Sequence, residues 1–212
     1  MVATPALAGP HGQAVRKATH EDVGRLADVL ARAFDGDPPM RWFLPDEKSR
    51  VNRARALFDL MLRRVHLHRG WCYTTEDVVG GALWVPPGSW RLGVVQQLAL
   101  LPGMLRVFGR GLARAQRGLA VMEQGHPSAP HYYLDSLGVA PEWQGRGLGS
   151  ALMAPVLERC DAERMPAYLN AGSPRSRELY RRHGFEVTEE FALPEGGPPL
   201  WRMWREPRQG RK

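Results

Sequence analysis

The sequence has 212 residues, enough for one domain of ordinary size with room for a sizeable insertion. Hydrophobic residues make up 43% and charged residues 24%, a composition typical of a soluble globular protein. The formal net charge of +7 favours an anionic partner, but it does not distinguish nucleic acid, a membrane surface and a small phosphorylated ligand.

The cysteine content and the two ends of the chain exclude several classes of protein. Cys72 and Cys160 are too few for a disulfide scaffold and are not spaced as metal ligands, so we expect a reducing, cytoplasmic setting. Residues 1–13 lack a basic region followed by an apolar run and are predicted to be a disordered lead rather than a signal peptide. Residues 207–212 are predicted to be a basic tail. The most apolar run, residues 92–109, is too interrupted by polar residues and proline to cross a bilayer.

The N-terminal half is predicted to form a strand, two helices and a hairpin. Residues 14–19 read as a strand, and Thr19 with Asp22 resembles a capping box that starts a helix ending near Phe34. The prolines of residues 35–47 break this helix before a second one at about residues 48–66. Two β-rich runs, at residues 71–76 and 78–85, are separated by a short turn and indicate a hairpin.

The C-terminal half is predicted to alternate strands and helices after a helical insertion at residues 89–127. We expect the insertion to be broken near residues 102–103 and at Gly109. Strands follow at residues 131–139 and 167–170, and a helix at residues 147–164 lies between them. Ser173 is expected to cap a further helix that stops at Gly184, and two strands around residues 194–199 end the fold. The absence of a repeat or a long linker favours one α/β domain over residues 14–206.

A glycine-rich, basic turn, Gln-Gly-Arg-Gly-Leu-Gly at residues 144–149, joins a predicted strand to a predicted helix. A helix N-terminus has unpaired N–H groups and the positive end of a dipole, so it can hold a phosphate. Glycine lets the backbone approach the anion closely. The turn is not a Walker A loop, and it lacks the spacing and the acidic residue of a dinucleotide fingerprint. The turn alone leaves open an anion cradle or a tight turn without a ligand.

The order of motifs around this turn resembles the GNAT superfamily of acyl-CoA-dependent N-acetyltransferases. Residues 144–149 match its pyrophosphate loop, and Leu179 and Tyr180 with Gly184 and Phe185 match its Leu-Tyr-x-x-x-Gly-Phe element. The resemblance covers residues 131–205 by motif and the preceding part only by topology. The helix start Ser-Pro-Arg and the late hairpin are most similar to the puromycin N-acetyltransferase group and its bacterial relatives.

The resemblance implies a GNAT fold, with a mixed central sheet whose fourth and fifth strands splay apart, helices on both faces and a helical insertion before the fourth strand. It implies that acetyl-CoA is the acyl donor and lies in the gap between the splayed strands, with no metal. The residues expected to bind it are Leu137, Val139, Gln144, Gly145, Arg146, Gly147, Leu148, Gly149, Ser150, Asn170, Ser173 and Tyr180.

The resemblance also implies a direct attack by an amine in a ternary complex. Tyr180 stands where the family has its general acid, and the backbone N–H of Leu137 is the candidate donor to the developing oxyanion. The general base stays open. Asp135 and Glu123 are candidates, and a water chain is another; Asp37 and Glu142 read more simply as solvated loop acids. The catalytic set is therefore predicted to be Tyr180, Leu137 and Asp135.

Two departures from the family point to a different acceptor. Asn170 stands where close relatives often have Glu and cannot take a proton, and Ser173 stands where many members have Asn. The acceptor is expected to be a small-molecule primary amine, such as an aminonucleoside or an antibiotic-like amine, held by the loop before the second helix and by the insertion. The predicted acceptor-binding residues are Asp37, Trp42, Phe43 and Trp90.

Other functions remain as alternatives. A protein or peptide amine is the main alternative acceptor, and a CoA-binding protein that has lost catalysis is a second. The charge suggests a nucleic-acid binder, but the basic residues are dispersed and form no known motif. A further alternative is that residues 89–124 form a helix on a membrane surface, but their proline and glycines weaken this interpretation. His66 and His68 are interpreted as surface histidines, because a metal site needs more ligands. We therefore expect no nucleic acid, no membrane and a monomer or homodimer.

Overall fold

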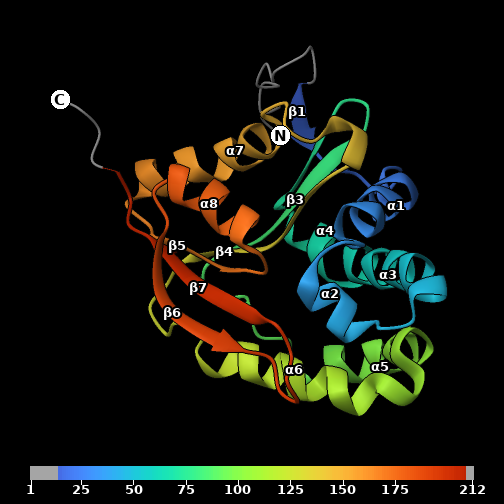
Figure 1. Ribbon diagram of the computed structural model, residues 1–212. Helices are drawn as coiled ribbons and strands as arrows, with labels where there is room; N and C mark the ends of the chain where they lie inside the picture. Colours follow the sequence, from blue (N-terminus) through green and yellow to red (C-terminus); the bar gives the residue numbers. More distant parts are fainter. Residues whose placement is uncertain (1–13, 209–212) are drawn as a thin grey trace.

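The computed structural model describes residues 14–208, so the predicted N-terminal lead and the last residues of the predicted tail lie outside the described chain. Its centre is a mixed sheet of seven strands in the order β1-β2-β3-β4-β5-β7-β6, with helices on both faces (Figure 1). The strands are β1 Val15–Lys17, β2 Cys72–Thr75, β3 Gly80–Val85, β4 Tyr132–Val139, β5 Ala167–Ala171, β6 Glu186–Ala192 and β7 Pro199–Arg205.

The helices follow the predicted order closely. They are α1 Val23–Phe34, α2 Pro38–Phe43, α3 Glu47–Met61, α4 Leu67–Arg69, α5 Val94–Phe108, α6 Leu112–Gln124, α7 Leu148–Glu163 and α8 Pro174–Arg182. A π-helical turn, η2 Leu62–His66, joins α3 to α4, and the 3-10 turns η3 Gly109–Gly111 and η4 Pro141–Trp143 precede α6 and α7. Ser173 caps α8 as expected, since its hydroxyl accepts from the N–H of Ser176 at 3.2 Å.

The gap between β4 and β5 is the feature of the sheet that positions the site. The two strands pair in parallel only from Tyr132 to Leu134 on β4 and from Ala167 to Leu169 on β5. Beyond this point β4 continues to Val139 paired with β3, and β5 continues paired with β7. The two strands therefore diverge toward their carboxyl ends, which confirms the predicted splay.

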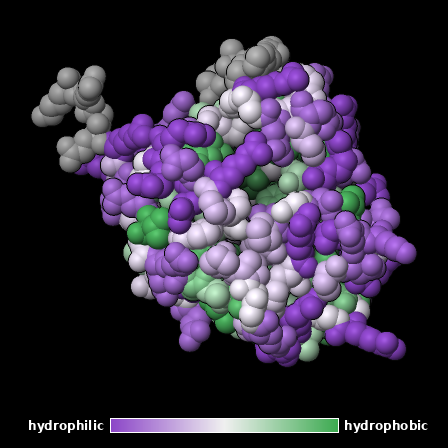
Figure 2. Space-filling model, in the orientation of Figure 1, coloured by the Kyte–Doolittle hydropathy of each residue, from purple (hydrophilic) through white to green (hydrophobic). Residues whose placement is uncertain are grey.

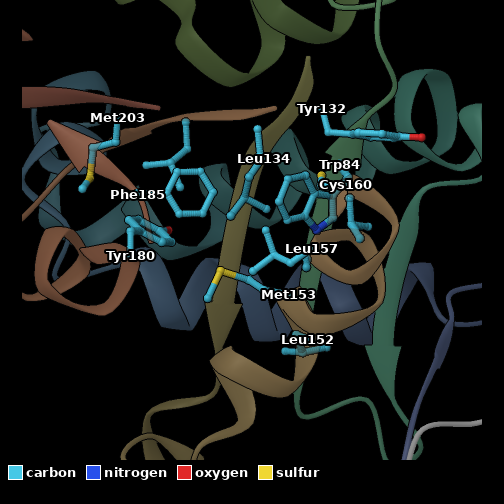
Figure 3. Packing of buried hydrophobic residues seen from close by; sticks show 14 of the residues in the cluster. Trp84, Tyr132, Leu134, Leu152, Met153, Leu157, Cys160, Tyr180, Phe185 and Met203 are labelled. Atoms are coloured by element: carbon cyan, nitrogen blue, oxygen red, sulfur yellow. The ribbon is translucent and has the colours of Figure 1, made fainter. Parts of the chain in front are cut away.

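Two apolar cores hold helices to the two faces of the sheet. The first lies under α7 and α8, where Leu152, Met153 and Tyr180 pack with strand residues such as Leu134 (Figure 3). The second lies under α1 and α3 and extends to Phe108 of the insertion. The insertion is thus fixed to the same face of the sheet as α1 and α3, and the opposite face carries α7 and α8 (Figure 1).

Of two predictions about proline, one was confirmed and one was wrong. Pro38 and Pro39 do end α1, but they also start α2, since proline is well suited to the first positions of a helix. Pro102 does not break the insertion, because α5 runs through it to Phe108 and the chain turns only at Gly109. Pro102 lies on the exposed side of α5, so the carbonyl that it leaves without a partner faces water.

Both cysteines are buried and unpaired, in agreement with the predicted lack of a disulfide scaffold. Among the helices in residues 14–208, none has the length and apolar character to cross a membrane.

Candidate active site

A cavity of about 970 Å³ extends from the gap between β4 and β5 to the inner side of the insertion. Its walls come from α1, α2, α3, α5, α6, β4, the start of α7, the end of β5 and α8. The space-filling view shows a hollow with hydrophobic residues in its depth, in the region between α8 and α2 (Figure 2). One continuous space therefore meets the glycine turn on one side and the loop before α2 on the other.

The glycine turn has a backbone that requires glycine at two positions. Gly145 has a φ of 78° and Gly147 a φ of 80°, in the left-handed region that residues with a side chain rarely adopt. Gly147 is the N-cap of α7, so the N–H groups of the first turn of α7 have no partner within the helix. Because Gly145, Gly147 and Gly149 line the cavity, these donors and the positive end of the α7 dipole are available to an anion there.

Side chains next to the turn already form contacts with other residues of the protein. Gln144 donates from Nε2 to the carbonyl of Val139 at 3.0 Å, so it fixes the turn to the end of β4. The guanidinium of Arg146 stacks over the ring of Trp143 at 4.9 Å and does not line the cavity of the described chain. Ser150 does line it, and its hydroxyl lies 2.8 Å from Nε2 of His183. The backbone of the turn, rather than Arg146, is thus the element presented to the cavity.

Two arginines that the sequence analysis did not select also face this part of the cavity. Arg175 and Arg182 lie on α8 and line the same cavity as the glycine turn. The sequence did contain an indication of them, because residues 174–182 hold four arginines and follow a capping serine. This indication was not specific, since basic residues near a helix end are usually solvated. They add positive charge where a phosphate would lie.

Tyr180 lines the cavity from α8 with little exposure to solvent. Burial, together with the nearby charge of Asp37, raises the pKa of Tyr180 well above its ordinary value. The phenol is therefore protonated at all physiological pH values and is available as a proton donor.

Asp37 lies in the wall of the cavity rather than in a solvated loop. It is the N-cap residue of α2, and a methyl group on Gly172, just past the end of β5, would lie 3.0 Å from its Oδ1. Burial raises the pKa of Asp37 from 3.8 to about 6, although the nearby backbone N–H of Met40 acts in the opposite direction. A carboxylate with a pKa near neutrality in a cavity with Tyr180 is suited to take a proton.

Asp135 is the residue of β4 that forms a bulge against β3, because Ser136 pairs with Leu83 and Leu134 with Trp84. Its side chain is one third exposed within the cavity, and its Oδ2 lies 3.3 Å from Nε2 of His66. Burial raises the pKa of Asp135, but His66, Ser136 and Arg69 more than offset this and hold it below its ordinary value. Asp135 is thus a permanent negative charge.

The interpretation of His66 as a surface histidine was wrong, whereas His68 is exposed as expected. His66 is 1% exposed and lies at the end of the π-helical turn η2. A π-helical turn contains one residue more than an α-helical turn, so a regular helical spacing does not predict that His66 lies beside Asp135. The spacing of two residues between His66 and His68 did not indicate that His66 is buried.

The remaining acidic candidates lie away from the cavity of the described chain. Glu123 is exposed near the end of α6, and Glu142 is exposed and accepts from Arg32 at 3.2 Å. Neither belongs to the cavity wall. Asn170 does, and its Oδ1 accepts from the hydroxyl of Tyr168 at 2.9 Å.

The aromatic residues predicted to hold the acceptor separate into two groups. Phe43 lines the cavity, but Trp42 and Trp90 do not belong to its wall within the described residues. Trp42 packs edge-on against Phe43 at 5.0 Å, and the Trp90 ring stacks on His126 with 3.8 Å between centroids. Trp42 therefore supports the wall from behind, while Trp90 anchors the start of the insertion.

The part of the cavity between α1–α3 and the insertion is mainly apolar. Its wall comes from α1 to α3 on one side and from the insertion on the other. The apolar side chains there are Phe34, Met40, Phe43, Leu57, Phe58, Met61, Met104, Phe108, Leu119 and Met122. Methionine adapts to irregular ligands, so such a wall suits an amphipathic molecule. No group of histidine, cysteine or acidic side chains in residues 14–208 is arranged to hold a metal ion.

The cavity can be tested against the acyl donor that the resemblance implies. A diphosphate needs an anion cradle, and the first N–H groups of α7 supply one with Arg175 and Arg182 nearby. An extended pantetheine arm needs a free strand edge, and β4 from Ser136 onward has no β5 partner. The donors present therefore fit acetyl-CoA.

Comparison with known proteins gives results consistent with this geometry. The model of the acetyltransferase (GNAT) family matches residues 39–185. An uncharacterized N-acetyltransferase of Schizosaccharomyces pombe is 26% identical over an alignment of 209 residues, which covers 92% of this chain and 83% of the yeast protein.

Solved structures show the same fold over nearly the whole chain. The crystal structure of a histone acetyltransferase HPA2 and related acetyltransferase from Corynebacterium glutamicum is 30% identical, with a TM-score of 0.71, over 94% of this chain and 99% of that one. A Drosophila melanogaster polyamine N-acetyltransferase has a TM-score of 0.60 at 15% identity, over 91% of this chain and 98% of that one, a likeness of fold alone.

Proposed function

Because the chain belongs to the acetyltransferase (GNAT) family, whose members use acetyl-CoA as the acyl donor, we propose that it transfers an acetyl group to the primary amine of a small molecule. The observation that carries this proposal is the shared cavity. The anion cradle of α7, the protonated Tyr180 and the carboxylate of Asp37 all line one space. An acyl donor and an acceptor bound there would meet between the two side chains.

The coenzyme is proposed to bind mainly through backbone groups. The N–H groups of residues 145–150 would hold the diphosphate, and Leu137 and Val139 would pair with the pantetheine arm like an added strand. Gln144 would support this backbone, since it already bonds to the carbonyl of Val139, and Ser173 would support the start of α8, where it caps the N–H of Ser176. Arg146 is proposed to help from the outside of the turn, where it stacks on Trp143.

The reaction requires a base, a donor to the oxyanion and an acid, and a different group of the protein is available for each role. Acetyl-CoA supplies an activated thioester. Asp37 takes the proton from the acceptor ammonium, which frees the lone pair that forms the C–N bond. The backbone N–H of Leu137 donates to the carbonyl oxygen as it gains negative charge. Tyr180 gives its proton to the departing sulfur as the C–S bond breaks, and it regains a proton from the nitrogen of the new C–N bond, which leaves a neutral amide.

Asp135 is proposed to attract the ammonium form of the acceptor rather than to act as the base. Its pKa lies below the ordinary value, so it is a weak proton acceptor near neutral pH but a constant negative charge. Asp37, whose pKa is raised to about 6, is the better base of the two. This refines the prediction that placed Asp135 in the catalytic set.

The acceptor is proposed to be a small amphipathic amine. The two acids lie on a wall that is otherwise rich in phenylalanine, methionine and leucine, which suits one cationic nitrogen attached to an apolar body. An aminonucleoside or an antibiotic-like amine has this character, as the resemblance to the puromycin N-acetyltransferase group suggests. The Drosophila neighbour forms N-acetylagmatine, so the fold is compatible with small amines.

A thiol-release assay with acetyl-CoA tests the proposal. It would use a panel of aryl and alkyl amines, aminonucleosides, polyamines and short peptides. We expect turnover with amphipathic monoamines and little with polyamines. Turnover only with peptides would replace the small-molecule acceptor by a protein amine. If acetyl-CoA raises the melting temperature but no amine is acetylated, the protein is a coenzyme binder without this activity.

A further inference from the structure

The outer face of α5 exposes a stripe of aliphatic side chains. Val94, Leu98, Leu101 and Leu105 are spaced by four, three and four residues, which places them on one side of the helix. Their exposed fractions range from 38% for Leu101 to 72% for Val94, and the adjacent Val95 is 80% exposed. Isolated exposed apolar residues need no explanation, but a continuous stripe on one helix marks an interaction surface.

A basic groove lies along the opposite flank of α5, where Gly103, Arg106 and Val107 form its α5 side. It has a volume of about 670 Å³, runs between α3 and α5, and is lined by Arg55, Arg63, Arg64 and Arg106. Asp59 is the one acidic residue in the lining, and it pairs with Arg63 at 3.0 Å. Arg55, Arg64 and Arg106 form no ion pair with any residue in the described part of the chain. Arginine is the side chain best suited to bind phosphate groups.

The positive charge of this region is not balanced by nearby sequence. Residues 78–122, which include the whole of α5 and most of α6, contain five arginines and no aspartate or glutamate. Long arginine side chains can cover apolar surface with their stems while the guanidinium reaches a polar boundary. Such a combination of an aliphatic stripe and a basic flank is suited to a surface that is apolar within and anionic at its boundary.

We propose that α5 and the α3–α5 groove dock on an anionic phospholipid surface. Val94, Val95, Leu98 and Leu105 enter the layer between the headgroups and the acyl chains, and the groove arginines bind lipid phosphates. The expectation of no membrane partner rested on Pro102 and on the glycines of residues 89–124, but α5 is continuous through Pro102 and Gly103 and keeps its stripe. The proposal concerns attachment to a surface and does not depend on acetyl transfer.

A second copy of this chain is a poorer occupant of the same surface. A two-fold dimer places the same patch against itself. Here it would bring Arg106 and its neighbours against their own copies, and the one acidic residue of the groove lining, Asp59, is already paired with Arg63. An anionic membrane supplies the missing negative charge.

Vesicle co-sedimentation tests the proposal directly. The protein is spun with phosphatidylcholine vesicles, with and without phosphatidylglycerol, at low and at high salt. We expect binding only to the vesicles with phosphatidylglycerol and release at high salt, which screens the charges. The double variant Leu98→Ser/Leu105→Ser removes the stripe, and Arg64→Ala/Arg106→Ala removes two groove charges. Each should lower the bound fraction about tenfold or more.

A matched control removes the same charge from the opposite face. Arg159→Ala/Arg181→Ala changes α7 and α8, and it should bind vesicles like the unmodified protein. Acetyl-CoA-dependent thermal shifts check that every variant is folded. The proposal is overturned if the unmodified protein stays in the supernatant with both vesicles, or if neither double variant weakens binding. It is also overturned if gel filtration shows a dimer that Leu98→Ser/Leu105→Ser dissociates, since the stripe would then be a self-interface.

Discussion

The two halves of the cavity are built in different ways. On the side proposed for the coenzyme, a short contiguous stretch supplies most of the groups, because residues 136–150 give both a free strand edge and the N-terminus of α7. On the side proposed for the acceptor, the wall is collected from α1, α2, α3, α5 and α6, and each helix contributes one to three phenylalanine, methionine or leucine side chains. The first half works through backbone geometry and the second through side-chain identity.

This difference separates what is common to the fold from what is particular to this chain. A backbone cradle tolerates changes of side chain as long as the glycine dihedral angles are kept. An acceptor wall of phenylalanine, methionine and leucine changes its selectivity with each substitution. Substitutions on the two sides should therefore change different kinetic constants, and those at the boundary between the sides should change the chemical step.

Tyr180→Phe should have the largest effect, because Tyr180 lies at the boundary. Without the hydroxyl no proton reaches the leaving sulfur, and we expect kcat to fall on the order of a hundredfold or more, with KM values nearly unchanged. Steady-state kinetics measures this. Tyr132→Phe is the matched control, since the Tyr132 hydroxyl bonds Glu163 at 2.8 Å outside the cavity. An equal loss in both variants would remove Tyr180 from the catalytic set.

Asp37→Asn should lower kcat by about a hundredfold if Asp37 is the base. The unmodified enzyme should lose activity as pH falls through about 6, where Asp37 becomes protonated. Because the pKa of this carboxyl is higher in the folded chain than in the unfolded chain, the folded state becomes less stable as pH rises from about 4 to about 6. The shift from 3.8 to about 6 corresponds to about 3 kcal/mol, so the neutral variant, which avoids this loss, should be more stable at pH 7 by up to about that amount.

Two measurements check this prediction, a pH–rate profile and thermal melts at pH 4 and pH 7. Glu142→Gln is a control, because Glu142 is an exposed acid outside the cavity wall. A variant that is inactive but no more stable at pH 7 would argue against a raised pKa. One that keeps its activity would return the role of base to Asp135 or to water.

Gly147→Ala should act on the coenzyme alone. Alanine at a φ of 80° is strained by roughly 1–2 kcal/mol, and relief of that strain would turn the N–H groups of α7 away from the diphosphate. We expect KM for acetyl-CoA to rise about tenfold, with little change in KM for the amine. Gly196→Ala, at a φ of 70° in the turn between β6 and β7, carries a similar strain far from the cradle. If both variants change KM for acetyl-CoA equally, the effect is general destabilisation.

His66→Gln should have a moderate effect that depends on pH. His66 helps to hold the pKa of Asp135 below its ordinary value, so its loss should raise that pKa and weaken the attraction for the ammonium in acid. KM for the amine should rise severalfold at pH 5 and less at pH 8. His68→Gln changes an exposed histidine of the same segment and should change neither. A rise in KM that is independent of pH would indicate a packing defect instead.

The sequence predicted the coenzyme side better than the acceptor side for a physical reason. The glycine turn, the capping serine and Tyr180 depend on neighbours within a few residues, and local rules place them. The role of His66 depends on a π-helical turn and on a bulge in a strand about seventy residues away. The raised pKa of Asp37 depends on its burial against Gly172, which is likewise a tertiary contact.

Leu119→Ala should have the smallest effect and gives the sharpest test of the division between the two sides. Leu119 lines the cavity from α6 and is 38% exposed, so its truncation costs little stability and removes apolar contact with the acceptor. KM for an amphipathic amine should rise about fivefold, and KM for acetyl-CoA should stay the same. Leu105→Ala is the matched control, because Leu105 is similarly exposed on α5 but lies outside the cavity wall. If Leu119→Ala instead raises KM for acetyl-CoA, the insertion contributes to coenzyme binding, and the two sides are not independent.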